Sequence, residues 1–321
     1  MWLFFTLRLL FLAQNRYFYI TSSQKYKLTM NKTPIADSEL IINADGSIFH
    51  LHIKPGQLAN KVILVGDPGR VAMIKEFFDT IECENANREF ISFTGTYKGK
   101  RISVLSTGIG TDNIDIVMTE LDALVNIDFK TRTPEDEHTT LEIVRIGTSG
   151  SLQADLPVDS WLLSEAAIGF DGVLNYYARR NEVSDLDFEQ AFETHVDWNP
   201  LLAKPYVVNG SSELIDRLRH DSRIHVGTTI SAPGFYGPQG RVVRLPLASP
   251  DLNERINTFR YNGRRVTNYE MECSCIYGLS LLLGHKPATV CAIIANRLAG
   301  QYSKDYKPVV KALVEHVLNN L

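Results

Sequence analysis

The sequence predicts an α/β fold in which helices cover both faces of a mainly parallel or mixed sheet. Short, almost continuously apolar runs such as 61–66 and 289–295 are typical of strands buried on both faces. Segments with apolar residues at helical spacing, such as 114–125 and 307–321, alternate with these runs. No linker or internal repeat interrupts the pattern after Met30, so we expect one domain over residues 30–321.

The composition is that of a globular protein, with 44% hydrophobic and 22% charged residues. The formal net charge of -4 argues against nucleic-acid binding, which normally needs a basic face. Four cysteines in 321 residues are too few for a disulfide framework, so we expect reduced thiols in a cytoplasmic protein. Cys273 and Cys275 also lack the spacing of a zinc site.

Residues 1–29 do not match this domain. Their apolar stretch, 1–13, is interrupted by Arg8 and is too short to span a bilayer. The sequence that follows it is a poor signal-peptide cleavage site. A membrane-surface anchor is an alternative, but we favour a disordered or spurious extension, with membrane binding unlikely and the working protein beginning at Met30.

The strand predicted over 61–66 ends in Gly66 and leads directly into a helix. Asp67 suits the N-cap position of that helix. A strand, a glycine turn and a helix start together form an anion site from free amides and the helix dipole. Arg70 lies in the first turn, where a cation is unfavourable without an anion nearby. The alternative is that it pairs with an exposed acid such as Glu76.

A hairpin and a helix are expected next. The hairpin strands are predicted over 90–97 and 101–106, and the helix over 114–125 follows Gly108 and Gly110. The third glycine of a dinucleotide fingerprint is missing, and no acidic residue follows at the required distance. We therefore expect no NAD site.

The stretch 141–152 joins an apolar run to a run of glycines and hydroxyls. Its first part, 143–146, predicts a buried strand, and 147–151 predicts a turn that lets a ligand approach the backbone. Open α/β sheets bind ligands at this end of their strands. Arg145 would be costly there unless an anionic ligand or a local carboxylate pairs with it, and both interpretations stay open at this point.

The segment 232–241 contains too much glycine and proline for a regular element, yet it carries two aromatic rings, an amide and an arginine. These groups can stack on and hydrogen-bond a planar heterocycle; the alternative is an ordinary surface loop. Glu270 and Glu272 would point to opposite faces of an extended segment, so one could face a ligand. We expect the acidic stretch 182–193 and the polar stretch 128–138 to be solvent-exposed segments.

Seven spaced motifs together resemble the nucleoside phosphorylase-I family and, within it, the uridine phosphorylases. They are Phe-His-Leu (49–51), Gly-Asp-Pro-Gly-Arg (66–70), Arg-Glu-Phe (88–90), Ser-Thr-Gly-Ile-Gly (106–110), Arg-Ile-Gly-Thr-Ser-Gly (145–150), Phe-Tyr-Gly-Pro-Gln-Gly-Arg (235–241) and Asn-Tyr-Glu-Met-Glu (268–272). The resemblance implies a three-layer α/β/α phosphorylase-type fold with a central mixed, partly barrel-like sheet. It also implies reversible phosphorolysis of uridine, with inorganic phosphate as co-substrate and no cofactor.

The resemblance assigns a role to each matching residue. Phosphate binding falls to Gly66, Arg70, Arg88, Arg145 and Thr148. Ribose binding falls to His50, Thr148, Met271 and Glu272, and base binding to Ser149, Gly150, Phe235, Gln239 and Arg241. Arg88 and His50 would be lent by a neighbouring subunit, which implies a homo-oligomer with shared sites, built from dimers and extending to hexamers in some relatives. Some relatives also bind a monovalent cation near the residue equivalent to Glu89, but Asn113 stands where they have a serine, so no metal is assigned.

Two further activities are alternatives within the same resemblance. Purine-specific members carry an aspartate after the penultimate strand, where this chain has Ala295-Asn296-Arg297. A purine nucleoside phosphorylase is therefore the second choice. A nucleosidase of the same fold would use water, which leaves the phosphate arginines without a role. A catalytically inactive relative would have lost at least one of these ligands, and all are present. The expected partners are uridine and phosphate.

Overall fold

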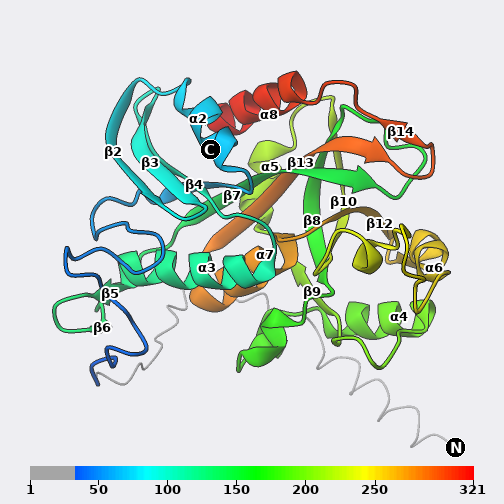
Figure 1. The fold of residues 1–321 in the computed structure, drawn as a ribbon, viewed down its shortest axis with the longest axis horizontal. Helices are drawn as coiled ribbons and strands as arrows, with labels where there is room; N and C mark the ends of the chain where they lie inside the picture. The colour runs from blue at the N-terminus through cyan, green and yellow to red at the C-terminus, as the bar shows by residue number, and fades with distance from the viewer. Residues whose placement is uncertain (1–32) are drawn as a thin grey trace, which may run out of the picture. The chain divides into compact units, whose positions relative to one another are not determined.

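A mixed β-sheet organises the part of the chain that this computed structural model describes, residues 33–321 (Figure 1). Ile35–Leu321 form one contact unit. The expectation of a disordered or spurious extension over 1–29 lies outside the described residues. Among the described helices, none has the length and apolar character needed to cross a membrane.

Strands and helices alternate along much of the described chain. The strands are β1 (Lys61–Val65), β2 (Thr80–Asn87), β3 (Phe90–Tyr97), β4 (Lys100–Ser106), β5 (Ile127–Asp128), β6 (Thr133–Pro134), β7 (Glu142–Ser151), β8 (Trp161–Gly169), β9 (Tyr206–Asn209), β10 (Ile224–Ser231), β11 (Arg260–Tyr261), β12 (Arg264–Glu270), β13 (Lys286–Asn296) and β14 (Gln301–Tyr302). The helices are α2 (Pro68–Lys75), α3 (Thr111–Asn126), α4 (Leu186–Val196), α5 (Ser212–Leu218), α6 (Leu252–Thr258), α7 (Cys273–Leu283) and α8 (Lys307–Asn320).

Part of the sheet closes on itself. The strand order runs β11-β12-β10-β8-β13-β7-β1-β4-β3-β2, and β12 also pairs with β7 through Asn268↔Ser151 and Tyr269↔Gly150. Strands β7, β13, β8, β10 and β12 therefore form a closed ring, while β1, β4, β3 and β2 extend it as an open sheet. This closure confirms the partly barrel-like mixed sheet that the family resemblance implies.

Helices cover both faces of the sheet and give three layers (Figure 1). Helices α2, α5 and α8 contribute apolar side chains such as Ile74, Leu214 and Leu313 to a core on one face. Helices α3 and α7 contribute Leu121 and Ile276, among others, to a second core on the opposite face. The predicted α/β/α architecture is confirmed.

Strand β7 lies at the centre of this arrangement because it pairs with β1, β13 and β12. The turn predicted over 147–151 is wrong: β7 continues to Ser151, since β13 stays paired with it as far as Asn296. Gly147 is required for a different reason. A Cβ there would lie 2.1 Å from Nη1 of Arg145 and 2.8 Å from Sγ of Cys291, so the glycine makes room for the arginine side chain.

Two other local predictions need correction. Residues 182–193 are not simply a solvated segment, because helix α4 buries Phe188, Glu189 and Phe192. Strand β2 was not predicted, since its alternation of half-buried and exposed residues reflects an edge strand with little apolar content. Of the four cysteines, Cys273, Cys275 and Cys291 are buried and Cys83 is partly exposed.

Candidate active site

A cavity of about 770 Å³ lies where strands β1, β4, β7, β12 and β13 end. This is the end of an α/β sheet at which ligands bind. It is lined by most of the site residues that the sequence predicts, namely Gly66, Arg70, Arg145, Thr148, Ser149, Gly150, Phe235, Gln239, Arg241, Met271 and Glu272. Predicted site residues from four segments far apart in the sequence therefore share one cavity.

Helix α2 begins at the edge of this cavity. Asp67 caps it, because its carboxylate accepts the N–H of Gly69 at 2.8 Å. Burial and the nearby positive charge of Arg145 lower the pKa of Arg70. Glu76, the alternative partner of Arg70, pairs with Lys311 instead, since its Oε2 lies 3.2 Å from Nζ of that lysine. Two guanidinium groups beside a helix N-terminus are an arrangement that can bind an anion.

Arg145 is buried and lies between two carboxylates. Its Nη2 contacts Oε2 of Glu272, and its Nη1 lies 3.2 Å from Oε2 of Glu270. Burial disfavours the charged arginine, but these two carboxylates outweigh that effect and raise its pKa. The Nε of Arg145 has no hydrogen-bond partner among the described residues. Arg145 therefore keeps one donor unused in a wall of the cavity.

The expectation that Glu270 and Glu272 face opposite ways is wrong. Strand β12 ends at Glu270, and the chain turns into α7, so both carboxylates reach Arg145. Glu270 accepts the N–H groups of Glu272 and Cys273 at 2.9 Å and the hydroxyl of Ser231 at 2.5 Å. Burial nevertheless raises the pKa of Glu270 to about 7. Glu270 thus ties Arg145 to the start of α7.

The glycine-rich segment after β10, residues 232–241, forms one wall of the cavity. Nη1 of Arg241 donates to Oε1 of Gln239 at 2.5 Å and to the carbonyl of Phe235 at 2.6 Å. Its guanidinium also stacks 3.9 Å from the centre of the Phe235 ring. Burial and the charge of Arg297 lower the pKa of Arg241. A ring, an amide and a guanidinium are therefore assembled on one loop, which favours a heterocycle site over an ordinary surface loop.

Sequence reasoning missed Arg297 and Tyr269, which also line the cavity. Arg297 binds the base-side loop from the other wall: its Nη1 donates to the carbonyl of Gln239 and its Nη2 to that of Gly240 at 3.1 Å. The hydroxyl of Tyr269 donates to Oδ1 of Asn253 at 2.9 Å. An arginine directly after an apolar strand was a usable signal for Arg297, because strand ends line this cavity.

A family model described as "Phosphorylase superfamily" matches residues 60–319 of the chain. This range includes every strand that borders the cavity. The chain belongs to the phosphorylase superfamily. The resemblance drawn from the seven motifs is thereby confirmed at the level of the family.

Relatives of this superfamily member include enzymes named for different nucleosides. A uridine phosphorylase from Thermococcus kodakarensis is 31% identical over 266 residues, 81% of this chain and 81% of that protein. A DeoD-type purine nucleoside phosphorylase from Streptococcus suis is 31% identical over 196 residues, 59% of this chain and 68% of that protein. The crystal structure of a Trypanosoma brucei nucleoside phosphorylase, described as showing uridine phosphorylase activity, matches with a TM-score of 0.76 at 28% identity, covering 88% of this chain and 99% of that chain.

Arg88 and His50 do not line the cavity of their own chain. Arg88 is exposed on the turn between β2 and β3, with a positive φ of 53°. Nδ2 of Asn87 donates to the carbonyl of His50 at 2.8 Å, so the two predicted residues lie on one surface. Their position is that of groups available to another molecule rather than to this chain's own cavity.

The cation that some phosphorylases hold near the position of Glu89 does not fit the residues here. Nδ2 of Asn113 donates to Oε1 of Glu89 at 3.0 Å and to the carbonyl of Thr107 at 2.9 Å. An amide donor, rather than the hydroxyl oxygen of a serine, therefore stands beside the carboxylate of Glu89. We assign no metal to this position.

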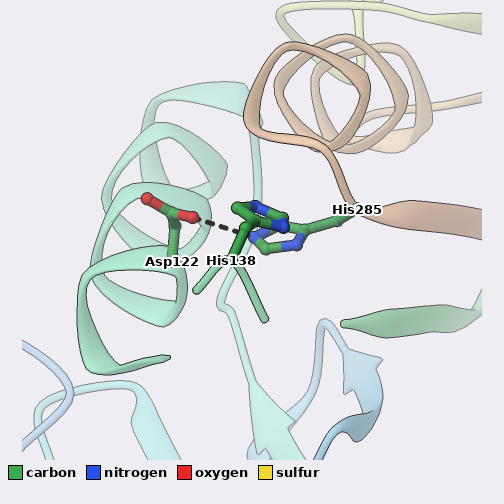
Figure 2. A group of neighbouring side chains, drawn as sticks. All are labelled: Asp122, His138 and His285. Atoms are coloured by element: carbon green, nitrogen blue, oxygen red, sulfur yellow. Dashed lines mark ion pairs between the residues drawn. The ribbon is translucent and has the colours of Figure 1, made fainter. Parts of the chain in front are cut away.

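A second group of metal-binding residue types, Asp122, His138 and His285, lies outside the cavity (Figure 2). Nδ1 of His285 accepts the N–H of Leu141 at 3.2 Å, so the neutral ring carries its proton on Nε2, which lies 3.2 Å from Oδ1 of Asp122. Nε2 of His138 lies 2.9 Å from the carbonyl of Leu283 and is likewise a donor. Protonated nitrogens do not bind metals, so we interpret this cluster as structural.

Proposed function

We propose that this chain is a nucleoside phosphorylase that cleaves uridine with inorganic phosphate and yields uracil and ribose 1-phosphate. The observation that carries the proposal is the pairing of two chemistries in one cavity. Arg70 and Arg145 form an anion site at one end, and Gln239 with Arg241 forms a heterocycle site at the other. The uridine phosphorylase activity described for the Trypanosoma brucei relative supports the choice of uridine.

The reaction needs a positioned nucleophile and a stabilised leaving group. Cleavage of a glycosidic bond passes through an oxocarbenium-like state. Phosphate held by Arg70, Arg145, Gly66 and Thr148 would attack C1′ from the face opposite the base. Fixed arginines contribute both positioning and electrostatic stabilisation.

The same cavity also offers groups that would bind the ribose and the base. Glu272, with Met271 beside it, would accept hydrogen bonds from the ribose hydroxyls. Gln239 and Arg241 would hydrogen-bond the negative charge that develops on uracil as it leaves, with Phe235 against the ring and Ser149 and Gly150 beside it. No general acid at the base is required in this scheme.

A purine substrate is the second candidate, because DeoD-type purine nucleoside phosphorylases are among the relatives. Asn296 stands after β13, and its Nδ2 donates to the carbonyls of Gln153 at 3.0 Å and Leu156 at 2.8 Å. It is thus a neutral group engaged with the backbone. A purine leaving group would need a proton donor at this end, which favours the pyrimidine.

The test is release of base from uridine, inosine and thymidine, each with and without inorganic phosphate. We expect phosphate-dependent release of uracil and a preference for uridine. Arg145→Gln should lose this activity, while Arg219→Gln, an exposed arginine paired with Asp216, should keep it. Release of uracil without phosphate would refute phosphorolysis and indicate a nucleosidase. A preference for inosine would refute the base assignment.

A further inference from the structure

Glu120 lies on the buried face of α3, yet its carboxylate contacts the turn that carries His50. Its side chain is 11% exposed. Its carboxylate accepts the backbone N–H of His50 at 3.1 Å and that of Leu51 at 2.9 Å. Oε1 also lies 2.6 Å from Nδ1 of the His50 ring. A single buried carboxylate therefore fixes both the backbone and the imidazole of His50.

These contacts determine which ring nitrogen carries the proton. An ionised carboxylate can only accept hydrogen bonds, so Nδ1 of His50 must be the donor. In the neutral ring Nε2 then has a free lone pair and acts as an acceptor. The hydrogen bond from Nδ1 is charge-assisted and therefore stronger than a neutral one.

The turn is also fixed from a second side. The carbonyl of His50 accepts a hydrogen bond from Asn87, which precedes Arg88. The ring of His50 lies edge-on to the rings of Phe49 and Phe90, with centroid distances of 4.7 and 6.5 Å. With its backbone N–H, its carbonyl and its Nδ1 all hydrogen-bonded, His50 has its Nε2 edge left for a ligand.

We infer that Glu120 is a positioning residue, which holds His50 with Nε2 as an acceptor for a hydroxyl donor. The inference rests on the proposed function, in which His50 reaches the 5′-hydroxyl of a nucleoside bound to a neighbouring subunit. The 5′-hydroxyl would donate its proton to Nε2. A nucleoside without that hydroxyl gains nothing from the arrangement, so the Glu120–His50 pair selects for 5′-hydroxylated nucleosides.

The first measurement concerns the tautomer and needs no activity. Imidazole 15N NMR of the whole protein, with the His50 signal identified by its loss in His50→Gln, should show the Nδ1–H form. Glu120→Gln keeps the shape of the side chain but adds an amide donor, which should shift His50 toward the Nε2–H form. An Nε2–H tautomer in the unmodified protein would overturn the inference even where Glu120→Gln does not fold.

The second measurement compares uridine with 5′-deoxyuridine in Glu120→Gln. Loss of one hydrogen bond is worth about 0.5–1.5 kcal/mol, so we expect kcat/KM for uridine to fall roughly 2- to 12-fold, with 5′-deoxyuridine unaffected. In a His50→Ala background Glu120→Gln should add nothing. Glu189→Gln, another buried carboxylate, which pairs with Arg180, should leave the ratio of the two substrates unchanged.

The outcomes separate the inference from the proposed function. An equal loss with both substrates would show that Glu120 only supports the fold, and would overturn the inference while phosphorolysis stands. Failure of the unmodified protein to release uracil with phosphate would instead refute the proposed function. The tautomer measurement would still decide whether Glu120 sets the state of His50.

Discussion

Gly147→Ala tests whether the position of Arg145 is controlled by the empty space beside Gly147. The added Cβ would lie 2.1 Å from Nη1 of Arg145 and 2.8 Å from Sγ of Cys291. Because the guanidinium is the end of a flexible side chain, we expect it to move away rather than β7 to shift. Its contacts with Glu270 and Glu272 would then break, and breaking a buried ion pair costs about 3–5 kcal/mol of stability.

The effect on activity follows from the same movement. One charged hydrogen bond to phosphate is worth about 1.5–3 kcal/mol, so kcat/KM for phosphate should fall roughly 10- to 150-fold. The assay is uracil release at fixed uridine with varied phosphate, together with thermal unfolding. Cys291→Ala added to Gly147→Ala removes only the clash with sulfur, so it should recover part of the stability and none of the activity. A folded Gly147→Ala protein with unchanged kcat/KM for phosphate would refute the reasoning.

Three further predictions follow from the charges of the site. Burial raises the pKa of Glu270 from 4.5 to about 7. As the pH rises, Glu270 therefore loses its proton in the unfolded chain before it does so in the folded protein. The free energy of unfolding should then fall between about pH 5 and 7. Glu270→Gln should flatten this slope in urea unfolding, and an unchanged slope would contradict it. Arg241→Ala should lower kcat/KM for uridine by roughly 10-fold or more without raising KM for phosphate; a parallel rise in that KM would count against a base-side role. Arg88→Ala mixed with Arg145→Ala should regain activity in hybrid oligomers, since one site of a shared pair would be intact, and proven hybrids without activity would exclude sharing.

Local sequence patterns could predict those parts of the site that a short segment builds by itself. The β-branched run before Gly66 and the capping residue Asp67 specify a strand end facing a helix start. The apolar spacing of Phe188 and Phe192 would also have predicted α4. That helix was missed because its acidic residues suggested a solvated segment, although one of them, Glu189, is buried.

The closed ring could not be predicted from such patterns. It depends on the pairing of Gly150 with Tyr269, residues that no local signal connects. The pairing places the end of β12 beside the end of β7, and the turn after Glu270 then brings a second carboxylate to Arg145. The glycines after Arg145 suggested a turn because a glycine that accommodates a neighbouring side chain has the same sequence appearance as one that bends the backbone.

The charges around Arg145 give a physical argument for the proposal that the active site is shared between subunits. At the proposed phosphate end of the cavity, the guanidinium groups of Arg70 and Arg145 are balanced by the carboxylates of Glu270 and Glu272 when both are ionised. Arg241 and Arg297 also line the cavity, but their guanidinium groups are hydrogen-bonded to the base-side loop. A phosphate dianion added to this set would leave a net negative charge in a partly buried site, which is unfavourable. Protonation of Glu270 would remove one unit of this negative charge, and one additional cationic side chain would neutralise another. Arg88 is exposed on the β2–β3 turn, outside its own cavity, and we propose that it supplies the missing charge to a second copy of the chain.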